Sequence, residues 1–218
     1  MHHEFWHARW ENNQIGFHLD EANPLLVRHF HQLALTPGQR VFVPLCGKSI
    51  DIHWLLAQGY HVVGAELSTL AVDALFESLA VIPDVRTEGA LTHYHAEHID
   101  IFNGDIFALG AAQLGHIDAI YDRAALVALP QEMRQRYSLH LRKITDQAPQ
   151  LLVSFEYDQS QQPGPPFSVN AQEVSSHYSA FYTLRLLADD PLSGGLKGKC
   201  PAQEQVWLLT ARSLAHAQ

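Results

Sequence analysis

Short apolar runs that suit buried strands alternate along the chain with stretches of helical periodicity. Strands that alternate with helices are typical of a mostly parallel, doubly wound sheet with helices on both faces. The strand candidates, in chain order, are RVFVPL, HVVGAE, THYHAEHIDIF (a strand or a hairpin), HIDAIYD, QLLVSFEY, FYTLRLL and QVWLLTA. Because no helix separates the last two, we expect them to form an antiparallel hairpin at one edge. The sequence therefore predicts an α/β fold with a seven-stranded, Rossmann-like sheet.

Capping and breaking residues place the helices between these strands. Asn23-Pro24 combines an N-cap with a proline at the first helical position, and Ser68 can cap a helix over about 69–79. Pro130 opens a further helix. The stretch from 83 to 89 predicts a break between elements, and the PGPP at 163–166 fits neither helix nor strand.

Length and charge limit the class of protein. The 218 residues predict one well-buried domain over 1–218, with a helical lid at 1–35. A net charge of −9 without a lysine or arginine run argues against a nucleic-acid partner. No apolar stretch approaches the roughly 20 residues that span a bilayer, and the N-terminus lacks a signal-peptide layout. The two cysteines, Cys46 and Cys200, cannot build a disulfide framework, so we expect a cytoplasmic protein. We also expect a monomer.

The stretch VFVPLCGKS at 41–49 ends the first strand, where doubly wound sheets bind their ligands. A nucleotide-phosphate loop needs a glycine five positions before Gly47, and Phe42 stands there instead. A dinucleotide fold needs further glycines so that a pyrophosphate can approach the turn. Since Leu45, Cys46 and Lys48 crowd Gly47, the sequence argues against both ATP and NAD.

Glu66 ends the second strand about twenty residues after Gly47, where an acidic side chain accepts hydrogen bonds from both ribose hydroxyls. The alternative is a strand-end glutamate that faces solvent. A ribose acceptor without a pyrophosphate cradle fits a nucleoside cofactor that carries no phosphate. S-adenosylmethionine is such a cofactor, and we predict that it binds here.

Several blocks of the sequence resemble one family closely. In chain order they are FWHARW, GFH, RVFVPLCGKS-D--WL, VVGAELS, IDAIYDRAALVAL and PGPPF. From Trp6 to Phe167 the chain resembles the thiopurine S-methyltransferases. The resemblance implies a class I methyltransferase fold, S-adenosylmethionine as methyl donor, and an aromatic or heterocyclic thiol as acceptor. Bacterial members are also linked with tellurite and selenium detoxification.

The resemblance also implies site residues. The family's cofactor contacts fall on Trp10, Leu45, Glu66, Asp105, Ile106 and Arg123, with Gly47 in the turn. Trp6 and Phe17 match aromatic positions, Phe17 beside the substrate. The PGPPF segment, from Pro163 to Phe167, would shape one wall of the acceptor pocket unless it is a plain surface turn. Animal members carry a serine where Asp105 stands.

Methyl transfer from a sulfonium is an in-line displacement whose leaving thioether is neutral, so alignment and charge placement suffice. We therefore expect no general base and no nucleophilic role for Cys46. Trp6 and Trp10, four residues apart, present one helical face that can cover the sulfonium or merely dock the helix. Arg123 can pair with the methionine carboxylate, steady an incoming thiolate, or form a salt bridge with Asp122 or another acid.

Two further functions and one metal hypothesis stay open. The chain could bind S-adenosylmethionine without turnover, or it could methylate inorganic tellurium or selenium species or another small thiol. In the run THYHAEH, His93 and His95 share a strand face and offer two metal ligands. Because no acidic or cysteine ligand with firm spacing completes the set, the sequence predicts no metal.

Overall fold

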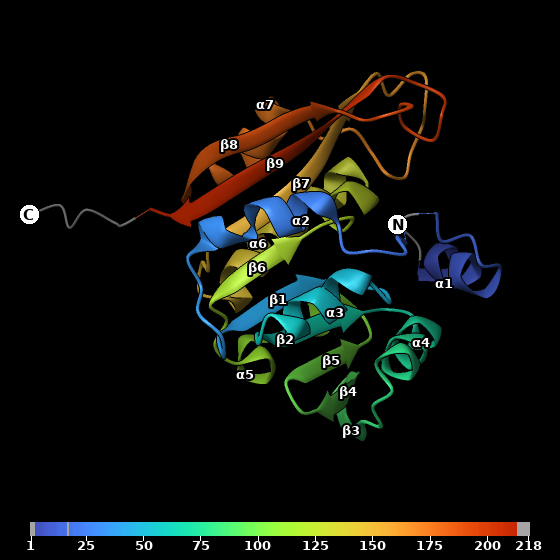
Figure 1. Cartoon of the computed structure of the whole chain (residues 1–218), viewed down its shortest axis with the longest axis vertical. Coiled ribbons are helices and arrows are strands. Elements are labelled where there is room, and N and C mark those ends of the chain that lie inside the picture. Colours follow the sequence, from blue (N-terminus) through green and yellow to red (C-terminus); the bar gives the residue numbers. More distant parts are fainter. Residues whose placement is uncertain (1–2, 17, 213–218) are drawn as a thin grey trace, which may run out of the picture.

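A computed structural model describes residues 3–16 and 18–212. Its central sheet has the strand order β3-β4-β5-β2-β1-β6-β7-β9-β8 (Figure 1). The predicted α/β class with a mostly parallel, doubly wound sheet is confirmed. The number of strands is not: the described residues form nine strands where the sequence analysis expected seven.

The parallel strands occupy the middle of the sheet. They are β1 (Arg40–Pro44), β2 (His61–Glu66), β5 (Ile99–Asn103), β6 (Ala119–Asp122) and β7 (Gln150–Tyr157). The chain runs from β1 outward to β2 and β5, then returns to place β6 on the other side of β1. The strand order therefore reverses beside β1, and the crevice at this switch point is where such sheets bind ligands.

Antiparallel strands complete both edges. The expected hairpin at the chain's end is confirmed as β8 (Tyr182–Pro191) and β9 (Ala202–Ala211), with β9 paired to β7. At the opposite edge, THYHAEHIDIF divides into β4 (Leu91–Ala96) and β5. His98 makes the turn between them with a φ of 64°.

The expected break at 83–89 is wrong, because β3 (Asp84–Glu88) lies there and pairs with β4. Its sequence, DVRTE, is almost wholly exposed and has no buried face. A strand of this kind shows no apolar alternation, so the periodicity that reveals the other strands is missing.

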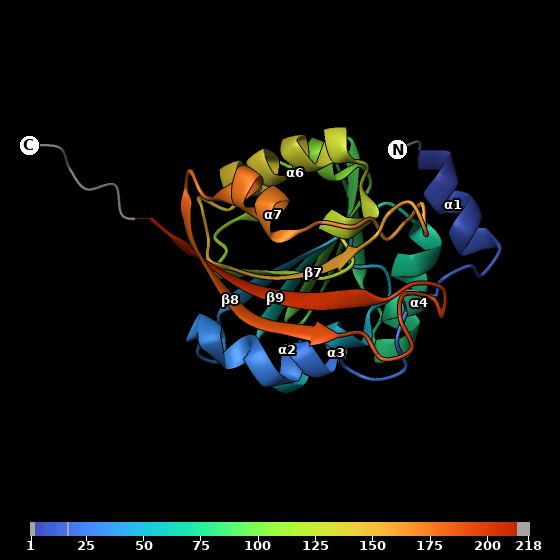
Figure 2. The same cartoon turned by 90° about the horizontal axis from the view of Figure 1, so that it is seen from above.

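Helices cover both faces of the sheet (Figure 2). One face packs against α2 (Pro24–His29), the 3₁₀ helix η1 (Phe30–Leu33), α3 (Ile50–Ala57) and α4 (Thr69–Leu79). The other packs against α5 (Ala111–Leu114), α6 (Gln131–Ile144) and α7 (Ala171–Tyr178). The short 3₁₀ helices η2 (Ile106–Ala108) and η3 (Leu126–Ala128) follow β5 and β6.

Alternate residues of each strand face these two layers. On β1, Phe42 packs toward α6, whereas Val41 and Val43 pack toward α2 and α3. All three side chains are buried. Both faces of the sheet are therefore apolar, which leaves the strand ends as the place for polar chemistry.

The predicted helix starts are confirmed. The Asn23 side chain accepts a hydrogen bond from the Leu25 amide at 2.8 Å, and Pro24 is the first residue of α2. The helix predicted over about 69–79 matches α4 at both ends, with Ser68 at the N-cap position but without a capping hydrogen bond from its side chain. Throughout residues 3–16 and 18–212, every helix falls short of the length and apolar character that crossing a membrane requires.

Candidate active site at the carboxyl ends of the parallel strands

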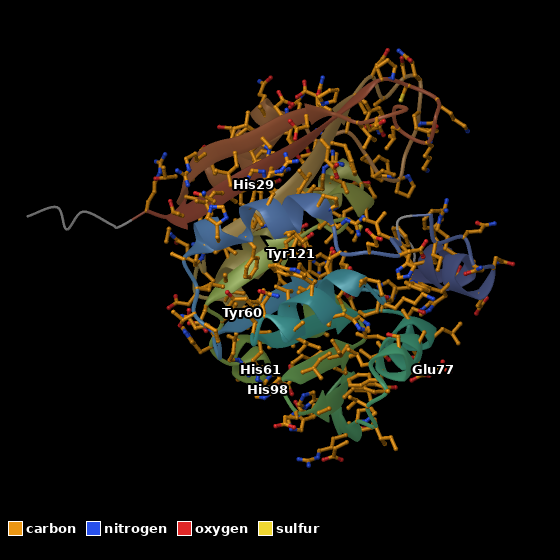
Figure 3. The ribbon with its side chains drawn as sticks, in the orientation of Figure 1. His29, Tyr60, His61, Glu77, His98 and Tyr121 are labelled. Atoms are coloured by element: carbon orange, nitrogen blue, oxygen red, sulfur yellow. The ribbon has the colours of Figure 1, made fainter. Side chains whose placement is uncertain are left out.

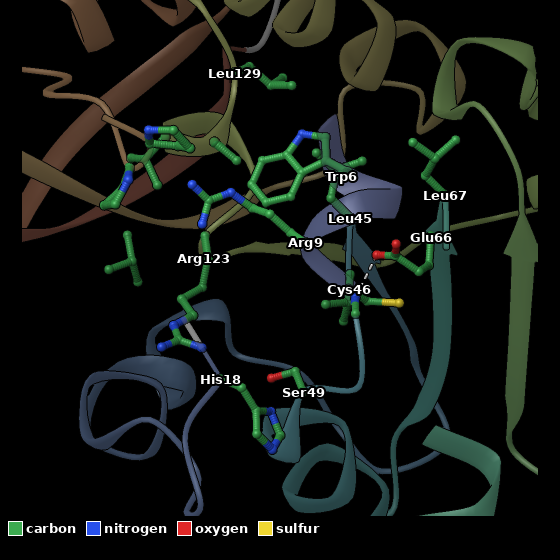
Figure 4. A pocket seen from close by; sticks show the side chains of 18 of the residues that line it. Trp6, Arg9, His18, Leu45, Cys46, Ser49, Glu66, Leu67, Arg123 and Leu129 are labelled. Atoms are coloured by element: carbon green, nitrogen blue, oxygen red, sulfur yellow. Dashed lines mark hydrogen bonds between the residues drawn. The ribbon is translucent and has the colours of Figure 1, made fainter. Parts of the chain in front are cut away.

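A cavity of about 530 Å³ opens at the carboxyl ends of the parallel strands, beside the switch point. It is large enough for a cofactor together with a small acceptor. The helix α1 (His3–Glu11) covers one side of it. Figure 4 shows Trp6 and Arg9 of α1 reaching into the cavity, with Glu66 on one side and Arg123 on the other.

The turn after β1 forms part of the cavity wall and has an unusual backbone. Leu45 and Gly47 both have left-handed conformations, with φ values of 47° and 53°. Glycine tolerates this, but for leucine it is strained, and strain of this kind concentrates at binding sites. Cys46 between them is buried over Gly64, where an added Cβ would lie 2.8 Å from the cysteine Sγ. Gly64 therefore gives the turn room to pack on β2.

Glu66 occupies the cavity end of β2 and is only 6% exposed. Its Oε2 accepts a hydrogen bond from the Gly47 amide and its Oε1 accepts one from the Ser68 amide, both at 2.8 Å. Burial raises the pKa of this carboxyl, although the two amides favour the charged form. A carboxylate has about four acceptor positions, so each oxygen keeps capacity for a ligand hydroxyl. The solvent-facing alternative for Glu66 is wrong.

The helix α1 supplies aromatic and basic groups. Trp6 and Trp10 line the cavity, as does Arg9, and α1 buries none of its own residues. The Arg9 Nε is buried and has no hydrogen-bond partner within the described part of the chain. An unpaired buried donor on a cavity wall fits a ligand that brings an acceptor, such as a carboxylate. The ring of His3 lies 3.5 Å from Asp105 and links α1 to the end of β5.

Asp105 and Ile106 lie together on the wall, as the resemblance implied. Asp105 is the N-cap of η2, and its Oδ1 accepts a hydrogen bond from the Phe107 amide at 2.9 Å. This bond fixes the carboxylate beside the buried Ile106 side chain. The pair therefore combines one acidic and one apolar contact at the same strand end.

Arg123 directly follows β6 and is 15% exposed. Its Nη1 lies 3.9 Å from the Oδ2 atom of Asp51. Asp122 is not its partner, because that buried carboxylate accepts hydrogen bonds from the Leu126 amide and the Tyr137 hydroxyl, at 3.0 and 2.8 Å. Burial raises the pKa of Asp122 to about 6. Among the ion pairs of the described residues, the guanidinium has one distant partner, Asp51, and the Glu204 carboxyl lies near enough to feel its charge.

Asp51 is a site residue that residue-level reasoning missed. It is 1% exposed, and it accepts hydrogen bonds from the Asn23 amide at 2.7 Å and the Tyr121 hydroxyl at 3.0 Å. These bonds join the segment before α2 to α3 and β6 on the cavity wall. The signal was present in the block VPLCGKS-D--WL, where the aspartate follows the turn at a fixed distance.

The substrate side differs from the expectation in detail. Pro163 and Phe167 do not line the cavity, whereas Pro165 and Pro166 do. The Phe167 ring lies 5.8 Å from the Arg134 guanidinium and its amide donates to the Val127 carbonyl. The PGPPF segment therefore forms a wall through its middle residues. Phe17 lies outside the described residues.

Two charged residues from the end of the chain also reach the cavity and were not foreseen. Lys197 donates a hydrogen bond to the Pro165 carbonyl at 2.7 Å, and burial, with the nearby Arg9 charge, lowers its pKa. Glu204 on β9 has its pKa raised by burial, against the effect of the nearby Arg123. Only tertiary structure brings these positions to the strand ends.

The comparisons with solved structures define the class. A 1,6-didemethyltoxoflavin-N1-methyltransferase of Burkholderia thailandensis, bound to S-adenosylhomocysteine, matches with a TM-score of 0.64 and 14% identity over 95% of this chain and 87% of that one. A methyltransferase from Anabaena variabilis that depends on S-adenosylmethionine matches with a TM-score of 0.63, 14% identity and 95% coverage of both chains. The fold is that of class I methyltransferases.

The family follows from the sequence comparisons. The family model for thiopurine S-methyltransferase matches residues 1–210. A thiopurine S-methyltransferase of Xanthobacter autotrophicus is 57% identical over 210 residues, which are 96% of this chain and 99% of that protein. One from Acinetobacter baylyi is 49% identical over 97% of this chain and all of its own length. The chain belongs to the thiopurine S-methyltransferase family and is an S-adenosylmethionine-dependent methyltransferase that acts on a small molecule.

Proposed function

We propose that this enzyme transfers the methyl group of S-adenosylmethionine to the sulfur of thiopurines and other aromatic or heterocyclic thiols, and releases S-adenosylhomocysteine. The observation that carries the proposal is the placement of the buried Glu66 carboxylate and the Arg123 guanidinium on opposite walls of one cavity, with α1 between them. A ribose acceptor and an anion-binding group are thus held at two ends of a single space.

The cofactor end is built from Glu66 and the groups around it. Its two oxygens keep acceptor positions for the two ribose hydroxyls. Asp105 and Ile106 would contact the adenine, and the left-handed turn at Leu45 and Gly47 would receive the methionine part. The indole rings of Trp6 and Trp10 would cover the sulfonium. We further propose that α1 acts as a lid, since it lines the cavity and buries no residue of its own.

The acceptor end is basic. Arg9, Arg123 and Lys197 all line the cavity there, and Pro165 and Pro166 supply a rigid apolar surface on which a flat ring can lie. We place Phe17 beside the ring as the family resemblance implies. A sulfur that enters as thiolate is attracted by these cations and needs no base within the site.

The cofactor, when bound, supplies the electrophilic methyl group. The thiolate lone pair forms the new sulfur–carbon bond while the bond from the methyl carbon to the sulfonium breaks, and both electrons of that bond stay with the departing neutral thioether. No proton moves in this step. The chain's residues therefore align the two sulfurs and screen the thiolate charge, which explains why a general base is not needed.

Variants of Arg123 test the acceptor end. Loss of a charge-assisted contact in Arg123→Ala should lower kcat/KM for the thiol by about 10- to 150-fold, equivalent to about 1.5–3 kcal/mol. Arg123→Lys keeps the charge but loses the planar fork, so its kcat/KM should lie between those of the parent enzyme and Arg123→Ala. The control is Arg86→Ala on the exposed strand β3, which should match the parent enzyme. Unchanged kinetics for Arg123→Ala with every acceptor and at every pH would make Arg123 a purely structural partner of Asp51.

An acceptor screen tests the reaction itself. Labelled S-adenosylmethionine is offered with thiopurines, simple aromatic thiols, and tellurium or selenium oxyanions, and release of S-adenosylhomocysteine is followed. Thiopurine turnover above the other acceptors supports the proposal; preferred chalcogen turnover favours the detoxification alternative, and binding without turnover leaves a cofactor-binding protein. We place the enzyme in the cytoplasm as a monomer without nucleic-acid or membrane partners, which sedimentation and cell fractionation would check.

A further inference from the structure

A second polar cluster lies at the amino ends of the parallel strands, away from the cavity. His61 begins β2, Asp100 is the second residue of β5, and His93 and His95 lie on β4. In the ladder His95 stands opposite Asp100, and Asp100 stands opposite Val63, two residues after His61. Because strand residues alternate, all four side chains project from the same face. Figure 3 shows His61 and His98 at this end of the sheet.

Asp100 is the centre of this histidine–aspartate cluster. Its Oδ1 lies 2.8 Å from His93 Nε2 and 2.7 Å from His95 Nδ1. The acidic ligand that sequence spacing did not reveal is therefore supplied by the neighbouring strand. Burial alone would raise the pKa of Asp100, but hydrogen bonds with His61, His95 and His93 outweigh it and hold the pKa well below its usual value.

Outer contacts fix the orientation of the inner groups. His93 turns its Nδ1 to Glu88 Oε1, at 3.1 Å, and its ring stacks on Phe102 with centroids 4.5 Å apart. Its Nε2 is thereby directed at Asp100. The other carboxylate oxygen, Oδ2, is held by His61 Nε2 at 2.7 Å. A carboxylate behind a ligating histidine, and a hydrogen bond behind a ligating carboxylate, are the supports found around metal sites in proteins.

The inner atoms have metal-site geometry. His93, His95 and Asp100 each offer one ligand atom, and these atoms lie within 4.8 Å of one another. Bonds of about 2.0–2.2 Å to a tetrahedral metal put ligand atoms roughly 3.4 Å apart, so small side-chain rotations suffice. The His95 side chain is 52% exposed, whereas that of Asp100 is 10% exposed. The site is therefore supported from inside and open to water at His95.

We propose that His93, His95 and Asp100 bind a divalent transition-metal cation, Zn²⁺ by preference, with a water molecule as the fourth ligand. Two imidazoles and one carboxylate are a donor set that Zn²⁺ accepts. Binding displaces the protons shared between the histidines and Asp100 to solvent. Arg40 is a nearby cation, and its Nη1 lies 3.7 Å from Asp100 Oδ2, the oxygen that would not contact the metal. The Glu88 carboxylate beside His93 adds a negative charge that offsets this cation.

The test uses the full chain, stripped of metal with a chelator. Zn²⁺ alone is titrated by calorimetry, and Co²⁺ is added separately to record the visible absorption of a tetrahedral site. We expect one dominant site, and the variant His95→Gln should weaken Zn²⁺ binding at least about tenfold. His98→Gln is the matched control, because His98 is exposed at the same edge and is not one of the three ligands.

The result that overturns the proposal is equally specific. The proposal is wrong if the parent chain and His95→Gln bind Zn²⁺ with equal affinity. It is also wrong if Zn²⁺ binding is lost in His98→Gln or His3→Gln and kept in His95→Gln. His93→Gln and Asp100→Asn should repeat the loss, and His95→Gln remains the decisive variant if they unfold. S-adenosylmethionine binding is measured on the variants of His93, His95, His98 and Asp100 and should not change, because these residues lie outside the cavity, so the outcome is independent of the proposed methyl transfer.

Discussion

Two buried carboxylates lie at opposite ends of the same sheet and have opposite surroundings. Glu66, at the carboxyl end of β2, is held by two backbone amides, and burial raises its pKa. Asp100, near the amino end of β5, is surrounded by histidine rings, and its pKa is lowered. The amides at Glu66 leave acceptor capacity that neutral hydroxyl groups of a ligand can use. The imidazoles at Asp100 create a site suited to a cation.

The difference follows from the ends of the strands. At the carboxyl ends, turns such as that at Gly47 lead toward helices, so free amide groups converge there. At the amino ends, neighbouring strands bring side chains together through their register, as His95 and Asp100 show. Backbone amides therefore orient the carboxylate at one end of the sheet, and neighbouring side chains orient the carboxylate at the other.

The largest expected effect concerns Glu66. Glu66→Ala removes the proposed acceptor of two ribose hydroxyls and should weaken S-adenosylmethionine binding by about 2–4 kcal/mol, measured by calorimetry. The control is Glu77→Ala, since Glu77 is exposed on α4 and should leave binding unchanged. The ribose role is wrong if folded Glu66→Ala binds the cofactor with the parent affinity. Binding of Zn²⁺ at the other end should not respond to this variant.

Asp100→Asn should lower the stability of the fold without changing the affinity for S-adenosylmethionine. Loss of charge-assisted hydrogen bonds should lower the free energy of unfolding by about 1.5–3 kcal/mol at neutral pH, measured with urea. The pKa of Asp100 in the folded protein lies below 3.8, its value in the unfolded chain. Its contribution to the free energy of unfolding is therefore fully present above about pH 4 and is lost as the pH falls further. Asp73→Asn on the exposed side of α4 is the control. Equal acid sensitivity of the parent and Asp100→Asn would contradict this interpretation.

Trp10→Leu should give a smaller effect that depends on the charge of the ligand. An indole that covers the sulfonium contributes about 0.5–2 kcal/mol to S-adenosylmethionine binding through cation–π attraction. The neutral thioether of S-adenosylhomocysteine gains no such energy, so its affinity should fall less. Calorimetry with both ligands separates the two roles. Equal losses for both would mean that Trp10 only docks α1.

The smallest effect is a difference in pH dependence between the two ends. Burial raises the pKa of Glu66 above 4.5. As the solution is acidified, Glu66 should therefore become protonated, and cofactor affinity should begin to fall, before the pH reaches 4.5. At the same pH Asp100 is still charged and the histidine–aspartate cluster keeps its carboxylate contacts. Cofactor binding should therefore be lost at a higher pH than the stability that depends on Asp100. Coincident losses would show that the carboxyls titrate together.

Much of the fold and of the candidate site could be predicted from the sequence, because a residue at the end of a strand is recognised from its immediate neighbours in the chain. Gly47 and Glu66 follow directly from apolar runs, and an apolar run marks its own end. Asp105 and Arg123 came from the resemblance, and both line the cavity. The exposed strand β3 could not be found in this way, since a strand without a buried face leaves no apolar pattern.

What escaped prediction depends on contacts between distant segments. Lys197 reaches the cavity through a loop that follows the hairpin strand β8, and Asp51 acquires its role from Asn23 and Tyr121. The histidine–aspartate cluster was half visible, because His93 and His95 share a strand. Its acid became apparent only when the β4–β5 register placed Asp100 opposite His95.

The buried thiol of Cys46 has a consequence for an enzyme that holds a powerful alkylating agent. Cys46 lines the cavity, yet burial and the nearby Glu66 charge raise its pKa well above the ordinary thiol value. A thiol that stays protonated is a poor nucleophile, whereas acidic aromatic thiols arrive ionised. We therefore expect the difference in ionisation to direct methyl transfer to the substrate sulfur and to keep Cys46 from being alkylated. Intact-mass measurement after long storage with S-adenosylmethionine should find no added methyl group on Cys46.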